Sequence, residues 1–570
     1  MKKGVVIVKK ILILFLAFTL SIFTLNHTSA EEIVHADLVI ENAHIFTVDK
    51  MNEEAEAIAI KNGRYVYVGD REGVEPYKGP QTTVLSLDQQ LLIPGFIDGH
   101  IHAHLKVEEI YSLDLSPYTT MEEYAQAIQQ YISDNPGLKQ LRAYGWRESV
   151  TLDASVSTEK MPIELADELV KNIPFVAQSI EGQKMWVNSK ALQLARVDEG
   201  TIVEHGMIER DSDTGMLNGV IRGLPVMQII FQALPQPDFT VEQYKTALLE
   251  FQKEAAMNGI TAAFVPLHSY TENLLQAFKE LDEEDELTLT YEIGLYVDKA
   301  KSLEQVDQLI EMKEKYKGEN FHIGTAKVFG TEPIEGAEEV FAWEQNEFNQ
   351  MIAKLDKEGF RIHVHARGPD LGEVFTGFEY AKAQNGKRNY FHTITHVPFV
   401  KRQDLVQFRK LRMIPSVQPA TFYHTFSVKE DDERLRTLNR MRSYFEKGIP
   451  VSSSSNYPME EMNPLYGIET GMTRLHPQET DEEIALWPRE RAMLRQMLRS
   501  YTIYPALQLG IDEYIGKIRV GKQADFIVLN QDLFEIPTSE ISETKVILTY
   551  FKGKEVYRDE ELIKEKNLSI

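Results

Sequence analysis

The middle of the chain alternates between short strand-like runs and longer helix-like runs. Apolar and polar residues alternate with a period of two at 360–365, which is typical of a strand, and the following run at 371–384 has the length and pattern of a helix. We expect strands at 360–365, 390–396, 413–417 and 449–455, and helices at 371–384, 403–411 and 433–447. This order predicts an α/β fold, a (β/α)8 TIM-like barrel. Residues 105–240 fit the repeat poorly and are interpreted as an insertion after the first barrel strand.

Both chain ends are rich in short β runs. They lie within 36–90 and 526–557, and Asn62-Gly63 between two of them is a strong signal for a two-residue hairpin turn. Because chain ends commonly lie close together, the simplest account is one small β-sandwich built from both of them. We expect the sandwich at 31–92 and 516–570, and the barrel with its insertion, at about 105–240, within 93–515.

Residues 1–30 are predicted to be a signal peptide. Four lysines precede an apolar run at 11–25, and the small residues Thr28, Ser29 and Ala30 offer a cleavage site. The alternative is a retained membrane anchor. No later stretch approaches the roughly 20 apolar residues that span a bilayer, so we expect a secreted protein with no stable membrane span after cleavage.

Charge and composition exclude several classes of function. The 570 residues carry a formal net charge of -26 and include no cysteine. An acidic surface repels phosphate backbones, so a nucleic-acid partner is not expected. The lack of cysteine excludes thiolate nucleophiles, iron–sulfur clusters and Cys-based zinc sites, so histidine and carboxylate must hold any metal. The expected partner is a small-molecule substrate, and a homodimer is left open.

Two histidines that follow the Pro-Gly-Phe-Ile-Asp run at 94–98 are the strongest candidates for chemistry. On a strand, His100 and His102 point to the same face and can bind one divalent ion. Further candidates recur at intervals of 38, 31 and 60 residues, which fit βα units of about 30 residues or more: Lys327, His365, His396 and Asn456. If His100 follows strand 1, these positions follow strands 4, 5, 6 and 8 and meet at the rim where such barrels place their chemistry.

The sequence resembles the amidohydrolase superfamily, in particular the subgroup that includes N-substituted formamide deformylases. The resemblance covers nearly all of the mature chain and rests on residues 93–102, 187–192, 258–261, 326–329, 365–368, 395–396, 418–419, 455–458 and 521–525. It implies one or two divalent ions, with zinc as the expected metal. It also implies that His100 and His102 bind the first ion, that His365 and His396 bind the second, and that carboxylated Lys327 bridges them.

The family's catalytic aspartate on strand 8 is replaced in this chain by Asn456. A carboxamide can ligate a metal weakly, but it cannot carry the proton from the attacking water to the leaving nitrogen. Glu332, Glu460 or Glu461 could supply a substitute carboxylate, and solvated loop acids are the alternative interpretation of each.

Other polar residues have a structural alternative beside a functional one. Gln183 stands where the family usually has a substrate-side histidine, and Trp146 and Glu148 lie where the insertion could roof the pocket. Plain packing is the alternative for Trp146 and Glu148. His104 is expected past the first strand in a supporting or surface role, and His363 in the barrel core.

Two functions are consistent with these residues. The first is a secreted metal-dependent amidohydrolase that hydrolyses a C–N bond, amide or N-acyl, of a small molecule by metal-bound hydroxide. The alternative is a catalytically impaired amidohydrolase-fold protein that binds a small molecule in the same pocket, because Asn456 replaces the aspartate.

Overall fold

The computed structural model describes residues 35–180, 183–203, 207–235, 239–268, 272–332, 339–368, 370–425, 433–566 and 568. The signal peptide predicted at 1–30 lies outside these described residues. Within them, no helix is both long and apolar enough to cross a membrane.

Parallel strands form a nearly closed barrel in the described part of the chain. In chain order they are β8 (Phe96–Asp98), β15 (Ile260–Pro266), β16 (Thr290–Tyr296), β17 (Phe321–Phe329), β20 (Arg361–Ala366), β21 (Thr393–His396), β22 (Ile414–Val417) and β23 (Ser452–Ser453), each paired with the next. The last strand returns to the first, since the Gly99 amide donates to the Ser453 carbonyl at 3.1 Å. The predicted fold class is confirmed, although only two residues of the strand predicted at 449–455 pair with β22.

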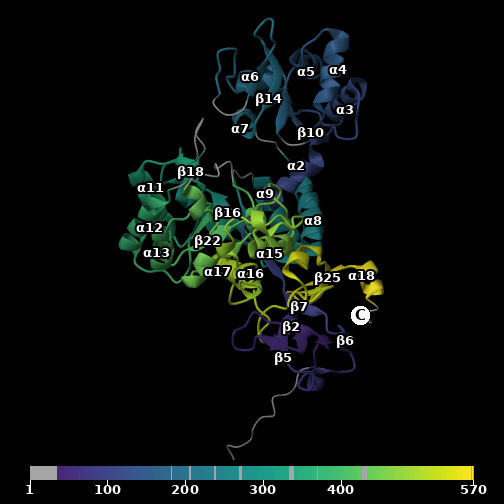
Figure 1. Ribbon diagram of the computed structural model, residues 1–570, viewed down its shortest axis with the longest axis vertical. Helices are drawn as coiled ribbons and strands as arrows, with labels where there is room; N and C mark the ends of the chain where they lie inside the picture. The colour runs from purple at the N-terminus through teal and green to yellow at the C-terminus, as the bar shows by residue number, and fades with distance from the viewer. Residues whose placement is uncertain are drawn as a thin grey trace, which may run out of the picture.

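Helices between the strands cover the outside of the barrel (Figure 1). They include α8 (Val241–Met257), α9 (Glu272–Glu283), α10 (Gln305–Lys315), α11 (Gln345–Lys357), α12 (Gly372–Asn385), α13 (Arg402–Leu411), α15 (Pro464–Thr473), α16 (Leu494–Ser500) and α17 (Ile503–Leu509). The start of α8 is fixed locally, because Thr240 and Gln243 form a reciprocal capping box. Tyr244, Leu248 and Phe251 on one face of α8 are buried in the main core.

Two further sheets come from the chain ends. One contains β1 (Leu38–Glu41), β4 (Ala57–Lys61), β5 (Arg64–Gly69) and β6 (Thr83–Ser86), and the other contains β2 (His44–Phe46), β3 (Glu54–Ala55), β7 (Leu91–Pro94), β24 (Phe526–Leu529), β25 (Val546–Phe551) and β26 (Lys554–Arg558). β24 pairs antiparallel with β7, so strands from both ends share one sheet. Asn62 and Gly63 join β4 to β5 with φ values of 49° and 70°, which confirms the predicted hairpin turn. A Cβ on Gly63 would lie 2.7 Å from the carbonyl oxygen of Lys552, so this turn needs glycine.

The segment between β8 and β15 forms a body that projects from the barrel (Figure 1). Its sheet contains β9 (Leu113–Asp114), β10 (Leu141–Trp146), β11 (Phe175–Ser179), β12 (Lys184–Val187), β13 (Met207–Arg210) and β14 (Leu217–Arg222), and its helices are α3 (Met121–Asp134), α4 (Glu148–Thr158), α5 (Pro162–Leu169), α6 (Ser189–Leu194) and α7 (Leu224–Ala233). It has its own apolar core, in which Trp146 stacks on Trp186. The connecting helix α2 (Lys106–Tyr111) packs on α8, and Lys106 forms an ion pair with Glu254 there.

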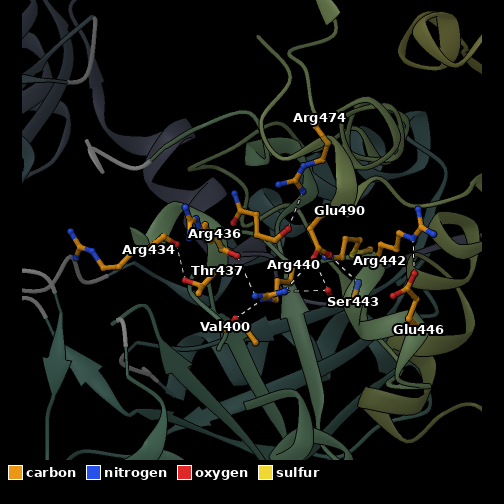
Figure 2. A network of polar contacts seen from close by, with 12 residues as sticks. Val400, Arg434, Arg436, Thr437, Arg440, Arg442, Ser443, Glu446, Arg474 and Glu490 are labelled. Atoms are coloured by element: carbon orange, nitrogen blue, oxygen red, sulfur yellow. Dashed lines mark hydrogen bonds and ion pairs between the residues drawn. The ribbon is translucent and has the colours of Figure 1, made fainter. Parts of the chain in front are cut away.

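The prediction of one helix at 433–447 is wrong. Two short pieces occupy this stretch, η4 (Glu433–Thr437) and α14 (Arg442–Glu446). The Glu490 carboxylate accepts hydrogen bonds from the backbone amide of Ser443 at 2.9 Å and from its hydroxyl at 2.5 Å, and Arg440 lies 3.4 Å from the same carboxylate (Figure 2). The local sequence favours a continuous helix, but a carboxylate from a distant segment stabilises a new helix N-terminus.

Candidate metal centre

The residues predicted to bind metal lie at one rim of the barrel. Lys327 lies in β17, His365 in β20 and His396 at the end of β21, whereas His100 and His102 follow β8. Ring centres lie 5.1 Å apart for His100 and His102, 5.0 Å for His100 and His396, and 4.6 Å for His365 and His396. Adjacent parallel strands place their carboxyl ends side by side, so positions far apart in the sequence meet here.

Lys327 is a fully buried amine within this group of rings. Its Nζ has no hydrogen-bond partner among the described residues. Burial lowers the pKa of Lys327 to about 7. Burial is the main cause that lowers the pKa of His100, His365 and His396, and positive charge on Lys327 lowers the three pKa values further. A lysine held in this way has a large neutral fraction at neutral pH, and its amine can act as a nucleophile.

Hydrogen bonds fix which ring nitrogen is free on two of the histidines. His396 Nδ1 lies 3.0 Å from the amide oxygen of Gln418, and His365 Nε2 lies 2.9 Å from a carboxylate oxygen of Glu339. Both partner oxygens accept, so each ring donates through that nitrogen and keeps a lone pair on the other one. Metal-binding histidines commonly show this arrangement, in which an acceptor orients the ring behind the ligating nitrogen.

His100 is held by a buried network behind the rim. Its Nδ1 lies 2.9 Å from His363 Nε2 and 3.3 Å from the hydroxyl of Thr395. Asp98 accepts from the backbone amides of His100 at 2.9 Å and of Ser455 at 3.0 Å, which joins the first strand to the last. His363 is therefore the buried, hydrogen-bonded core histidine that the sequence predicts.

Asn456 lies just beyond β23 at the same rim. Its backbone has a φ of 62°, a left-handed conformation that asparagine tolerates. Its backbone amide donates a hydrogen bond to the backbone carbonyl oxygen of His100 at 2.8 Å. Asn456 is thus tied to the segment that carries His100 and His102. A neutral carboxamide there neither accepts a proton nor offsets the charge of a cation.

Glu339, a carboxylate that no sequence pattern indicated, contacts His365 at the rim. Glu339 lies directly before a short ribbon strand, and besides His365 it accepts a hydrogen bond from the Thr331 hydroxyl at 2.6 Å. Burial raises the pKa of Glu339, but the hydrogen bonds from His365 and Thr331 hold it below its usual value, so the group is ionised. No motif or strand interval singles out Glu339, because it lies in a loop after β17.

The acids considered as substitute carboxylates have other surroundings. Glu332 is exposed and forms an ion pair with Lys299. Glu461 accepts a hydrogen bond from the backbone amide of Asn463 at 3.3 Å. Burial raises the pKa of Glu460. Of the acids in this part of the barrel, Glu339 is the one that makes a hydrogen bond to a rim histidine in the described structure.

Two more histidines lie beside His102. His104 lies in η2 (Ala103–Leu105), with its ring centre 5.7 Å from that of His102, and His268 follows β15, with its ring centre 4.6 Å from that of His102. Among the described residues, one ligand atom from each of the three rings lies within 4.8 Å of the other two. No motif indicates His268; the signal that could have found it is its place two residues after the second barrel strand.

The three residues predicted to contact substrate lie in the insertion. Trp146 is fully buried and stacks on Trp186, Glu148 forms ion pairs with Lys184 and Arg222, and Gln183 is exposed just before β12. The structure thus places Trp146 and Glu148 in contacts within the insertion, and substrate binding by the three residues stays a prediction.

The residue types at the rim fit a divalent cation. His100 and His102 are buried and His365 and His396 are half-buried. Burial lowers the pKa values of all four imidazoles, so they are neutral, as ligation requires. The ring nitrogen Nδ1 of His102 and the amine of Lys327 are buried polar atoms without a hydrogen-bond partner in the described structure. Groups of this kind are costly inside a protein unless a ligand engages them.

Comparisons with known proteins agree with this geometry. A model of the amidohydrolase family matches residues 83–557. The N-substituted formamide deformylase of Arthrobacter pascens is 23% identical over 564 residues, covering 91% of this chain and 97% of that protein. YtcJ of Bacillus subtilis is 24% identical over 541 residues, covering 90% of this chain and 98% of that protein.

Solved structures share the fold. An uncharacterized metal-dependent hydrolase from Pyrococcus horikoshii superposes with a TM-score of 0.65 at 18% identity, covering 88% of this chain and 99% of that one. An adenosine deaminase from Xanthomonas campestris with bound zinc superposes with a TM-score of 0.50 at 12% identity, covering 94% of this chain and 98% of that one. These two structures support the barrel architecture.

Proposed function

The chain belongs to the amidohydrolase family, and we propose that it cleaves the C–N bond of a small amide or N-acyl compound and that it is secreted. The broader statement, that it is a metal-dependent hydrolase of this family, rests on the family match and on the relatives described above. The observation that carries the finer proposal is the convergence of four neutral imidazoles and one buried amine at a single rim. Secretion is supported by the sequence of residues 1–30 alone.

In this proposal, His100 and His102 bind one divalent ion and His365 and His396 bind a second. Neutral imidazoles without thiolates suit zinc and related ions. A bound ion of this kind lowers the pKa of a water molecule and polarises the carbonyl group under attack. The chain's own contribution is to orient the rings, as Gln418 does for His396.

Lys327 is proposed to be carboxylated. Its neutral amine attacks carbon dioxide, a nitrogen–carbon bond forms as one carbon–oxygen π bond breaks, and one proton leaves, so a neutral amine becomes an anionic carbamate. The support is the buried Nζ without a hydrogen-bond partner, in a site whose other proposed ligands are all uncharged. An anion at this position offsets the charge of the bound cations, which uncharged imidazoles cannot do.

Glu339 is proposed to carry the proton that Asn456 cannot carry. It is ionised and hydrogen-bonded to His365 at the rim. In this role the carboxylate exchanges its hydrogen bond from His365, which lies behind the ligating nitrogen of that ring, for one from the attacking water; it then accepts the proton of the water and delivers it to the leaving nitrogen. His365 and Thr331 hold the carboxylate in place through donated hydrogen bonds.

Asn456 also favours a second candidate function, a protein that binds a small amide in the same pocket without turning it over. This candidate depends on the absence of a carboxylate at strand 8. It makes a different prediction, because ligand binding then persists in a chain that shows no metal-dependent turnover.

The test uses the purified mature chain, metal analysis and a panel of N-formyl and N-acetyl amines. We expect zinc in the protein, turnover that chelation abolishes and zinc restores, and a loss of about 100-fold or more in His365→Ala. His322→Ala is the matched control, because His322 lies at the opposite end of the same strand as Lys327. Turnover that is absent from a zinc-loaded chain would favour the binding protein, and a chain that takes up no divalent metal would contradict both ligand assignments.

Secretion is tested by sequencing the N-terminus of the protein recovered outside the producing cells. A chain that begins at Glu31 is expected. A chain that keeps its first 30 residues and sediments with membranes would show a retained anchor instead.

A further inference from the structure

We propose that His102, His104 and His268 form a cation site of their own at the edge of the barrel rim, which takes a borderline divalent ion such as Zn²⁺. The inference rests on the proposed function and refines it: a neutral imidazole has one lone pair, so His102 binds the ion of this cluster in place of the ion that it was assigned together with His100. It adds two ligands, His104 and His268, and places an ion between strands 1 and 2 rather than over the centre of the barrel.

The first step is the placement of the three rings by adjacent strands. His102 and His104 follow β8, and His268 follows β15, which pairs in parallel with β8. Their ligand atoms lie within 4.8 Å of one another. A tetrahedral zinc site needs about 3.4 Å between imidazole nitrogens, since each Zn–N bond is about 2.0–2.1 Å. Small rotations of the side chains are enough to close the difference.

The second step is the state of the ring nitrogens. His102 is 2% exposed, and its Nδ1 is buried with no hydrogen-bond partner among the described residues. His104 Nδ1 is likewise buried without a described partner. A buried ring nitrogen without a hydrogen-bond partner is costly inside a protein, and a cation bound to its lone pair removes that cost.

The contacts of the neighbouring histidines distinguish this cluster from the rest of the rim. His100 Nδ1 is already engaged by His363 and Thr395. The ring of Phe329 contacts His268 at 5.5 Å and His365 at 5.0 Å between ring centres, so an aromatic ring lies between the new cluster and the Glu339 side of the rim. His268 is exposed, which gives an ion access from solvent.

The ligand types decide which cation the cluster would take. Three uncharged nitrogen ligands suit Zn²⁺, Cu²⁺, Ni²⁺ or Co²⁺, whereas Mg²⁺ and Ca²⁺ require oxygen ligands. A site with three protein ligands leaves a further coordination position for water or for a ligand, as in catalytic zinc sites.

The test compares zinc binding by the metal-free mature chain and by matched variants. The double variant His104→Ala/His268→Ala removes the two ligands that only the new site uses, and His365→Ala/His396→Ala removes two that only the Lys327-centred site uses. His322→Ala is the control. Zinc per chain is measured by mass spectrometry, affinity by titration calorimetry, and ion position by anomalous diffraction from wild-type crystals.

We expect His104→Ala/His268→Ala to lose one zinc per chain, or to weaken its binding on the order of 100-fold, while His365→Ala/His396→Ala and the control keep that ion. Anomalous density between the three rings would support the site even if the double variant fails to fold. Unchanged zinc number and affinity in the folded double variant, or wild-type density confined to the surroundings of Lys327, would overturn it. The proposed function fails on a separate result, the absence of turnover in a chain that still binds zinc.

Discussion

Replacing Glu339 by glutamine isolates the proton-carrying role from the structural one. The carboxylate accepts hydrogen bonds from His365 at 2.9 Å and from the Thr331 hydroxyl at 2.6 Å. A glutamine carbonyl oxygen can accept the same two hydrogen bonds in nearly the same volume. Glu339→Gln therefore keeps the ring of His365 oriented but removes the negative charge and the proton acceptor.

The expected magnitude follows from what is lost. General acid–base help is worth about 10²–10⁴ in rate, or about 3–5 kcal/mol in the activation barrier. Loss of an orienting partner behind a metal ligand would instead appear as a 10–100-fold change in metal affinity. Because glutamine keeps the orienting contact, we expect kcat to fall by about 10²–10⁴ while zinc content stays near the wild-type level.

The assay measures kcat and zinc per chain on the same preparations, with an N-acyl substrate that the wild type turns over. Glu332→Gln is the matched control, because Glu332 lies in the neighbouring ribbon strand β18 (Thr331–Glu332) but is exposed and paired with Lys299. The control should stay within about threefold of wild type, as expected for an exposed ion pair. A Glu339→Gln chain that retains full zinc and turns over within threefold of wild type would refute the assignment.

In the wild-type background, Asn456→Asp is expected to change kcat by no more than about threefold. In the Glu339→Gln background, the same substitution is expected to raise kcat by at least about tenfold. A rise of about 100-fold in the wild-type background would show instead that the native site lacks a proton carrier. Burial raises the pKa of Glu292 to about 7, so the folded chain binds this proton more tightly than the unfolded chain and loses stability as pH rises from about 4.5 to about 7. Glu292→Gln removes that dependence. Across this pH window, denaturant titrations should show the free energy of unfolding of the variant rising relative to that of the wild type by up to about 3 kcal/mol, and a difference that does not change with pH would contradict the pKa shift. Glu490→Ala leaves the amide and hydroxyl donors at the start of α14 without their acceptor and should lower the free energy of unfolding by about 2–4 kcal/mol. Glu482→Ala, which removes an exposed ion pair with Arg491, should lower it by less than about 1 kcal/mol. Equal melting temperatures for the two variants would contradict this expectation.

Much of the barrel could be predicted because its signals are local. The period of two at 360–365 and the helix at 371–384 correspond to β20 and α12, and the turn at Asn62-Gly63 needs the left-handed conformation that these two residues adopt readily. The helix predicted at 433–447 failed for the opposite reason. Its interruption depends on Glu490, which lies more than 40 residues away in the sequence.

The candidate site likewise contains residues that local sequence signals predict and residues that they do not. His100 and His102 were found from their spacing on a predicted strand, although that prediction is wrong in one respect, because β8 ends at Asp98 and both histidines follow it. Lys327, His365 and His396 were found from intervals that match βα units. These signals exist because parallel strands bring their carboxyl ends to one rim, so that position along the chain predicts position in space.

The sequence by itself determined the barrel, the absence of thiol chemistry, the histidines near the strand ends and the carboxamide of Asn456 where the resemblance leads one to expect an aspartate. Only the tertiary structure decided that Glu339 contacts His365, that His268 lies beside His102 and His104, and that the Lys327 amine is buried with no hydrogen-bond partner among the described residues. The physical reason is that strand ends follow from local periodicity, whereas the course of a loop and the burial of a polar atom depend on contacts between segments that no local pattern encodes.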